Sequence, residues 1–440
     1  MFVTSLDSES VRWALGAALV VLAAVAVIGV VLIRAPSGKT EVGVVATLHR
    51  GTTCGSTYVM RVDPVTLERR GNRSLRLPGS FAEPVSSPDL QRVALAGSEG
   101  SIAIAQLGSM RRSDAIRLGG PFAAAGVVSW PAANRFVAEA FLADAHRIGT
   151  HRLVVVDPAR KRVLHQLHVD QWWSTGNGRT DGGRVAVLIA SSIRLGHPRL
   201  LVVGIDGEIR TVNLTRMRAG LGYSREAEVG RFPGLAVDST GERAFVVNEG
   251  DPVAIVDLRT LSVRYRRVSG LAAPPRSLAG PAHDTGTAEP RRGPNRTAQW
   301  LGAGLVAISG FDGYTGPIGR FLGDSDAPAG IQILDTRTWR IKTLDRRPSS
   351  FEWLGGRLVA YARAWDPRAR RVRGDALVAF DRTGRVRYRV RGKGYWRSFA
   401  GRIFLEDSHS RLMDVLDPRD GHRLGKVSRD RLFALDSGYC

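Results

Sequence analysis

A short apolar phrase that ends in Asp recurs along the chain at intervals of about 45 to 50 residues. Each copy has the composition of a β-strand, and each is followed by a brief turn and a second strand-like run. A repeat of this length that contains no helical pattern requires the chain to stack similar strand units along its length. The copies are Val59–Asp63, Leu153–Asp157, Leu201–Asp206, Val253–Asp257, Ile331–Asp335, Leu377–Asp381 and Val415–Asp417.

Each Asp-ended run has an apolar partner just upstream, as in Arg92–Ala96, Arg184–Ile189 and Arg357–Tyr361. Short continuous apolar runs are typical of strands that are buried on both faces. An inner-strand signal with a Gly, Pro, Asp or Ser turn precedes several of them, so each unit is expected to contain four strands. The pattern predicts an all-β fold, a β-propeller of four-stranded blades. Eight blades are expected, with seven as the alternative.

The count depends on the two ends of the array. The interval from Asp63 to Asp157 holds two units, and Ile102–Ala105 is the copy whose turn lacks the Asp. The first unit, which begins near Val42, lacks an inner strand. We expect Arg431–Leu435 to supply that strand, which would close the ring and protect its sheet edges.

Two stretches of the chain do not follow the strand repeat. Residues 270–297 are rich in Pro, Gly, Ala and Arg, show no strand pattern and are expected to be disordered. Residues 311–330 include Asp312, Asp324 and Asp326. Carboxylate oxygens are Ca²⁺ ligands, so these three residues form a candidate metal site, with a solvated acidic loop as the alternative.

The chain is strongly basic, with 63 Lys and Arg against 41 Asp and Glu and a formal net charge of +22. A surface for anionic polymers or lipid headgroups is one explanation, and a GC-rich coding sequence that inflates Arg is the other. Nucleic acid is not an expected partner. The cations Arg385, Arg387, Arg389, Arg391 and Lys393 alternate with other residues, which places them on one face of a strand. Protection of an outer sheet edge is the expected role, with an anion-binding site as the alternative.

Residues 13–33 are uncharged and almost wholly apolar, long enough to cross a bilayer as one helix. A cleavable signal peptide is the alternative, but no small-residue cleavage site follows Ile33. The expected organisation is a tail at 1–12, a transmembrane anchor at 13–33, a linker at 34–41 and a propeller domain at 42–440. Flanking charges weakly favour a cytoplasmic propeller, although large domains cross membranes largely regardless of such charges.

The chain has two cysteines, Cys54 near the start of the repeats and Cys440 at the end. Because the two ends of a ring meet, a Cys54–Cys440 disulfide would staple its closure and imply an oxidising compartment. Two unrelated free thiols are the alternative. The disulfide prediction places the propeller outside the cytoplasm, on a single-pass cell-membrane protein.

The phrases Leu416–Leu424 and Phe380–Val386 resemble the repeats of pyrroloquinoline-quinone-type and YVTN-type β-propellers, and Val237–Phe245 resembles the second strand of YVTN and WD-type repeats. The resemblance spans most of residues 42–436 and implies a membrane-anchored bacterial propeller. These families include enzymes, scaffolds and recognition modules. Most copies lack the Gly and Trp of the quinoprotein consensus, so no cofactor is expected.

No nucleophile elbow, zinc-protease motif, Walker loop or dinucleotide fingerprint occurs in the sequence, and no catalytic residue is predicted. The function expected is therefore that of a membrane-anchored, extracytoplasmic binding or scaffold module of the cell envelope. Its expected partners are the membrane, through the N-terminal helix, and an envelope protein or an anionic polymer. The alternatives are a propeller enzyme, either a lyase or a hydrolase, and an envelope sensor that binds polyanions.

Overall fold

The computed structural model shows residues 44 to 440 as a unit built from successive antiparallel sheets. Within the full chain it describes the following residues: 44–50, 56–79, 81–89, 91–97, 100–112, 115–118, 124–141, 150–170, 172–174, 179–181, 183–191, 194–223, 228–271, 292–314, 327–348, 350–366, 371–391, 396–406 and 410–436.

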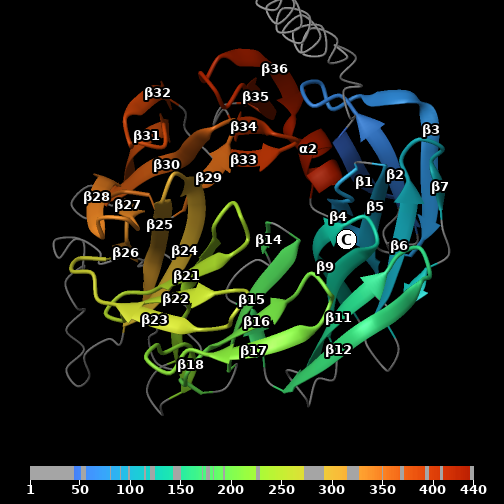
Figure 1. The fold of residues 1–440 in the computed structure, drawn as a ribbon. Coiled ribbons are helices and arrows are strands. Elements are labelled where there is room, and N and C mark those ends of the chain that lie inside the picture. Colours follow the sequence, from blue (N-terminus) through green and yellow to red (C-terminus); the bar gives the residue numbers. More distant parts are fainter. Residues whose placement is uncertain are drawn as a thin grey trace, which may run out of the picture. The chain divides into compact units, whose positions relative to one another are not determined.

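Successive antiparallel sheets, numbered here as blades in chain order, make up this unit (Figure 1). Blade 1 contains β1 (Val44–Arg50), β2 (Ser56–Val62) and β3 (Arg69–Pro78). Blade 2 contains β4 (Phe81–Ser86), β5 (Arg92–Gly97), β6 (Ser101–Gln106), β7 (Arg111–Arg112) and β8 (Ile116–Arg117). Blade 3 contains β9 (Ala124–Ala132), β10 (Arg135–Phe141), β11 (Thr150–Asp157) and β12 (Arg162–Asp170). Blade 4 contains β13 (Trp172–Ser174), β14 (Arg179–Asp181), β15 (Arg184–Ser191), β16 (Arg199–Val203) and β17 (Ile209–Asn213).

A two-stranded ribbon, β18 (Gly220–Tyr223) and β19 (Glu228–Arg231), precedes the second half of the unit. Blade 5 contains β20 (Gly234–Val237), β21 (Arg243–Val247), β22 (Val253–Asp257) and β23 (Val263–Arg266). Blade 6 contains β24 (Arg292–Gly302), β25 (Leu305–Tyr314), β26 (Ala327–Pro328), β27 (Ile331–Asp335) and β28 (Arg340–Asp345). Blade 7 contains β29 (Glu352–Leu354), β30 (Arg357–Asp366), β31 (Arg371–Phe380) and β32 (Val386–Arg391). Blade 8 contains β33 (Trp396–Phe399), β34 (Arg402–Glu406), β35 (Leu412–Leu416) and β36 (Arg423–Ser428), and α2 (Arg429–Asp436) follows it.

Clusters of buried apolar side chains lie between neighbouring blades and close them into a ring. Ile104 of blade 2 packs with Phe136 of blade 3, and Phe245 of blade 5 shares a cluster with Val306 of blade 6. Every adjacent pair of blades shares such a cluster, including blades 8 and 1. The described residues therefore form an eight-bladed β-propeller. This confirms the expected count of eight blades, and the seven-bladed alternative is wrong.

Burial follows strand position within a blade. The middle strands are almost fully buried, as in β15, whereas outer strands such as β32 expose alternate residues. Arg385, Arg387, Arg389 and Arg391 are all exposed at the outer strand of blade 7, as predicted for them, whereas Lys393 lies outside the described residues. The continuous apolar runs of the sequence are therefore the strands sandwiched between blades.

The recurrent Asp residues form the turn between the third and the outer strand. The Asp63 Oδ1 atom accepts hydrogen bonds from the backbone N–H groups of Val65 and Thr66, at 2.8 and 2.9 Å. Asp257 does the same for Arg259 and Thr260, at 3.0 and 2.7 Å. The Asp side chain satisfies backbone donors that the tight turn leaves unpaired, which is why the residue recurs.

The C-terminal segment corrects one expectation. Residues 431–435 belong to helix α2, not to an inner strand of blade 1. The segment contains no β-branched residue and is rich in Leu, Ala and Arg, which favour a helix. Leu432 is fully buried in the cluster shared by blades 8 and 1, so the ring is closed by packing of a helix.

A second correction concerns residues 292–297, which were expected to be disordered and instead form the first half of β24. Residues 1–43, which include the predicted tail, anchor and linker, lie outside the described residues. Among the residues that are described, no helix has both the length and the apolar character needed to cross a membrane.

Candidate functional site

The two faces of the ring differ in the length of their connections. We call the face that carries the Asp turns the Asp-turn face, and there the connections from third to outer strand are no longer than that at 63–68. The opposite face, here the long-loop face, carries the connections from second to third strand and from one blade to the next. Three long connections start and end there: residues 214–233 join blade 4 to blade 5, residues 267–291 join blade 5 to blade 6, and residues 315–326 join β25 to β26 within blade 6.

The long-loop end of blade 6 is built by an extended hairpin. β24 and β25 pair from Arg292↔Tyr314 to Gly302↔Leu305, whereas β27 pairs with β25 only from Leu305 to Ile308. The hairpin therefore extends beyond β27, and β26 pairs with its projecting half at Phe311 and Asp312. Gly310 is needed within it, because a Cβ atom there would lie 2.0 Å from the carbonyl oxygen of Asn295.

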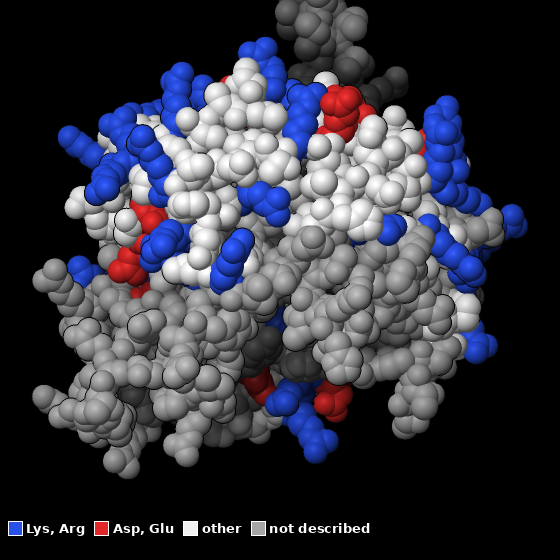
Figure 2. All heavy atoms as spheres, turned by 90° about the horizontal axis from the view of Figure 1, so that it is seen from below, with Lys and Arg blue, Asp and Glu red and all other residues white. Residues whose placement is uncertain are grey.

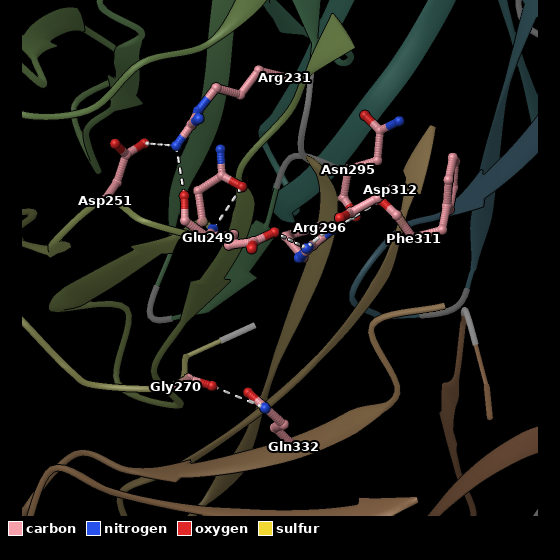
Figure 3. A network of polar contacts seen from close by, with 10 residues as sticks. Arg231, Glu249, Asp251, Gly270, Asn295, Arg296, Phe311, Asp312 and Gln332 are labelled. Carbon is pink, nitrogen blue, oxygen red and sulfur yellow. Dashed lines mark hydrogen bonds and ion pairs between the residues drawn. The ribbon is translucent and has the colours of Figure 1, made fainter. Parts of the chain in front are cut away.

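Arg296, in the projecting half of β24, is the centre of a buried polar network (Figure 3). Its side chain is 0% exposed, and its Nη2 atom lies 2.6 Å from Asp312 Oδ1 and 2.8 Å from Glu249 Oε2. Its Nη1 atom donates to the carbonyl oxygens of Asn295 and Phe311, at 3.0 and 2.8 Å. A buried guanidinium is tolerated when carboxylates and carbonyls surround it in this way.

A second ion pair adjoins the first through Glu249. The Arg231 Nη2 atom lies 3.1 Å from Asp251 Oδ2 and donates to the carbonyl oxygen of Glu249 at 2.5 Å. Figure 3 shows Glu249 between the Arg231–Asp251 pair and the Arg296–Asp312 pair. The network thus joins β19, the β21–β22 loop and the β24–β25 hairpin.

The network holds the ends of two of the three long connections, 214–233 and 315–326, and a separate hydrogen bond holds the start of the third. Phe232, which follows β19, exchanges backbone hydrogen bonds with Pro294 and Arg296, at 2.9 and 2.8 Å. Phe311 and Asp312, just before 315–326, are held by Arg296. Gly270, at the start of the third connection, accepts a hydrogen bond from Gln332 Nε2 at 3.1 Å.

Some buried polar atoms beside this network have no partner within the described part of the chain. They are Asn248 Nδ2, Asn295 Oδ1 and Arg231 Nε. Buried polar groups are normally hydrogen-bonded to protein or to an ordered water. The site therefore has donor and acceptor capacity for a small polar group.

The predicted metal site is only partly covered by the structure. Asp312 is fully buried and paired with Arg296, whereas Asp324 and Asp326 lie outside the described residues. Within the described ranges, no group of three or more His, Cys, Asp or Glu is arranged to hold a metal ion. The calcium site remains a prediction, as does the Cys54–Cys440 disulfide, because both cysteines are outside the described residues.

Comparison with known proteins gives similarity in structure only. No protein-family model and no curated protein matches this chain. Similar solved structures include dihydro-heme d1 dehydrogenase NirN in complex with DHE, at 11% identity and a TM-score of 0.49 over 88% of this chain and 73% of that one. BamB from Moraxella catarrhalis is 13% identical, with a TM-score of 0.43 over 79% of this chain and 87% of that one. Apo AztD from Citrobacter koseri is 11% identical, with a TM-score of 0.40 over 88% of this chain and 94% of that one. The β-propeller fold is established by this chain's own sheets and apolar clusters.

Proposed function

We propose that this protein is a membrane-anchored, extracytoplasmic β-propeller that acts as a non-catalytic binding or scaffold module of the cell envelope. The observation that carries the proposal is that one buried network holds the ends of two long connections on one face, with a separate hydrogen bond at the start of a third. A rigid ring that positions long loops is the usual arrangement of a recognition surface. The partner expected there is an envelope protein.

The network itself favours positioning over chemistry. The Asp312 carboxylate is fully buried against Arg296, a geometry that fixes the β24–β25 hairpin. The apolar stretch at 13–33 and the two cysteines support the membrane and envelope parts of the proposal.

The partner is tested on the full chain, extracted from membranes in mild detergent and purified at elevated salt, with quantitative mass spectrometry of what remains bound. A second form replaces residues 274–289 by a short Gly-Ser linker, which leaves β23 and β24 intact. We expect one envelope protein in near-stoichiometric amount with the native chain, and a loss of most of it with the shortened form. Thermal unfolding monitored by circular dichroism checks that both forms are folded.

The same protein retained by both forms would place its binding surface elsewhere, and a folded native chain that retains no protein would overturn the scaffold proposal. Localisation is tested by fractionation and by protease treatment of intact and permeabilised cells. A propeller that protease reaches only after the cytoplasmic membrane is opened would contradict the extracytoplasmic placement.

A further inference from the structure

Each blade carries an exposed Arg on the Asp-turn face, close to the turn from the third to the outer strand. The Arg lies either in that turn or within the first two residues of the outer strand. In blades 5 to 8 these residues are Arg259, Arg337, Arg382 and Arg419. The repeated fold therefore places one such cation in every blade. We call Arg259, Arg337, Arg382 and Arg419 the turn arginines.

The acidic residues of these turns cancel only part of this charge at the surface, as Asp206 and Glu208 do beside Arg210. The Asp63 and Asp257 carboxylates are directed into the turn, where they accept backbone N–H groups. Arg337 lies 3.3 Å from Asp335, yet its side chain is still 68% exposed. Pairs this exposed contribute little energy, so such a guanidinium can turn to another anion.

The wider surface is also basic. Figure 2 shows more Lys and Arg than Asp and Glu side chains on the described surface that it presents. Among the exposed residues of the third-to-outer turns, the acids are Glu68, Asp206, Glu208 and Asp420, fewer than the cations. A surface with this balance attracts polyanions at long range.

The chain enters the propeller at this same face. Val44, the first residue of β1, pairs with Val62, which immediately precedes the Asp turn of blade 1. Residues 34–43, between the predicted anchor and β1, reach at most about 35 Å when fully extended. The predicted anchor is therefore connected to the propeller through the Asp-turn face.

We propose that the Asp-turn face is a docking surface for an anionic lipid bilayer, with the turn arginines binding headgroup phosphates. This inference rests on the proposed membrane anchoring for its geometry. A planar guanidinium forms paired hydrogen bonds with phosphate oxygens, and basic residues beside a membrane segment are attracted to anionic lipid. The long-loop face then points away from the membrane, toward the envelope partner.

The test uses residues 44–440, which contain all eight apolar clusters and thus the whole core. Sedimentation with vesicles compares phosphatidylcholine alone with phosphatidylcholine containing phosphatidylglycerol. We expect binding to the anionic vesicles only, and its loss at high salt. Substituting Gln for Arg259, Arg337, Arg382 and Arg419 should weaken binding at least about tenfold.

A matched variant removes the same charge elsewhere, with Gln at Arg264, Arg267, Arg389 and Arg391, which are exposed in or next to the outer strands. It should retain most of the binding. An equal loss of vesicle binding in both variants would show non-specific attraction to net charge and would overturn the proposal. Equal binding to neutral and anionic vesicles, or no binding to anionic vesicles, would overturn it as well.

The result is separable from that of the partner experiment. Vesicle binding by residues 44–440 does not require the anchor, and the Gln variant of the turn arginines should still retain the envelope protein when made in the full chain. A failure of docking would therefore leave the scaffold proposal standing, and the reverse also holds.

Discussion

At the scale of single residues, Arg296 illustrates how a charge can be kept inside this fold. Taking a guanidinium out of water costs several kcal/mol, which Asp312, Glu249 and two backbone carbonyls offset. Removing one member leaves another charge buried without its counter-ion. The stability of the site therefore depends on the pair more than on either side chain.

We expect Arg296→Met to lower the free energy of unfolding by about 3–5 kcal/mol, because the Asp312 carboxylate is then buried without its guanidinium. Urea denaturation provides the measurement. The double variant Arg296→Met/Asp312→Leu should lose less than the sum of the single variants, since the pair is coupled. Arg389→Gln, on an exposed edge, should stay within about 0.5 kcal/mol of the native protein. A similar small effect for Arg296→Met would show that the buried pair is dispensable.

The Asp turns predict a loss of stability in acid. The backbone N–H of Thr66 and the Arg70 side chain lower the pKa of Asp63 from 3.8 to about 2. Hydrogen bonds from Thr260 and Arg337 likewise lower the pKa of Asp257 and of Asp335. A carboxylate whose pKa is lowered by folding stabilises the native state above its unfolded value, and that stabilisation disappears as the pH falls from about 4 toward 2.

Thermal unfolding across that pH range measures the effect. Replacing Asp63, Asp257 and Asp335 by Asn keeps the turn acceptors but removes three titrations, so the pH dependence should become shallower. An unchanged slope would mean that these carboxylates do not contribute to acid denaturation.

At the scale of elements, sequence reasoning succeeded where a signal is local. The buried second and third strands and the Asp turns could be predicted because apolar runs and turn formers lie within one hairpin. The first half of β24 could not, since its Pro, Gly and Arg residues become a strand only by pairing with β25 and with Phe232. Helix α2 was missed because its short sequence has only one buried anchor, Leu432, among its described side chains.

Leu432→Ala tests whether α2 closes the ring. The side chain is fully buried with Met60, Val62 and Phe404, so its truncation should cost about 2–5 kcal/mol of unfolding free energy. Leu424→Ala, at a side chain that is 37% exposed, serves as the control and should cost much less. Urea unfolding of both variants provides the comparison. Equal costs would mean that α2 contributes no specific packing to the closure.

At the scale of the whole molecule, the candidate site could not be predicted because its residues meet only after the blades are assembled. Arg231, Glu249 and Arg296 are separated by long stretches of sequence, and none lies in a motif. Asp312 was selected as a metal ligand, and the structure shows it instead beside a guanidinium. The repeat identifies the ring, whereas the departures from the repeat build the face that distinguishes this propeller.

Closure of the ring brings the first and the last blade together. Cys54 lies in the connection between Arg50 and Ser56, at the end of β1 opposite the Asp turn. Helix α2 begins near that turn, where Arg431 Nη1 donates to the carbonyl oxygen of Thr66 at 3.2 Å.

We expect a Cys54–Cys440 disulfide in the mature protein, which joins the first blade to the last. A cross-link over so long a loop stabilises the native state by up to about 4–5 kcal/mol, because it restricts the unfolded chain. Peptide mapping without reductant should recover one cross-linked peptide, and reductant should lower the unfolding midpoint. The variant Cys54→Ser/Cys440→Ser should unfold at the midpoint of the reductant-treated native protein, and reductant should not change that midpoint. Recovery of both cysteines as free thiols would show that the ring is closed by the α2 contacts and the cluster between blades 8 and 1 alone.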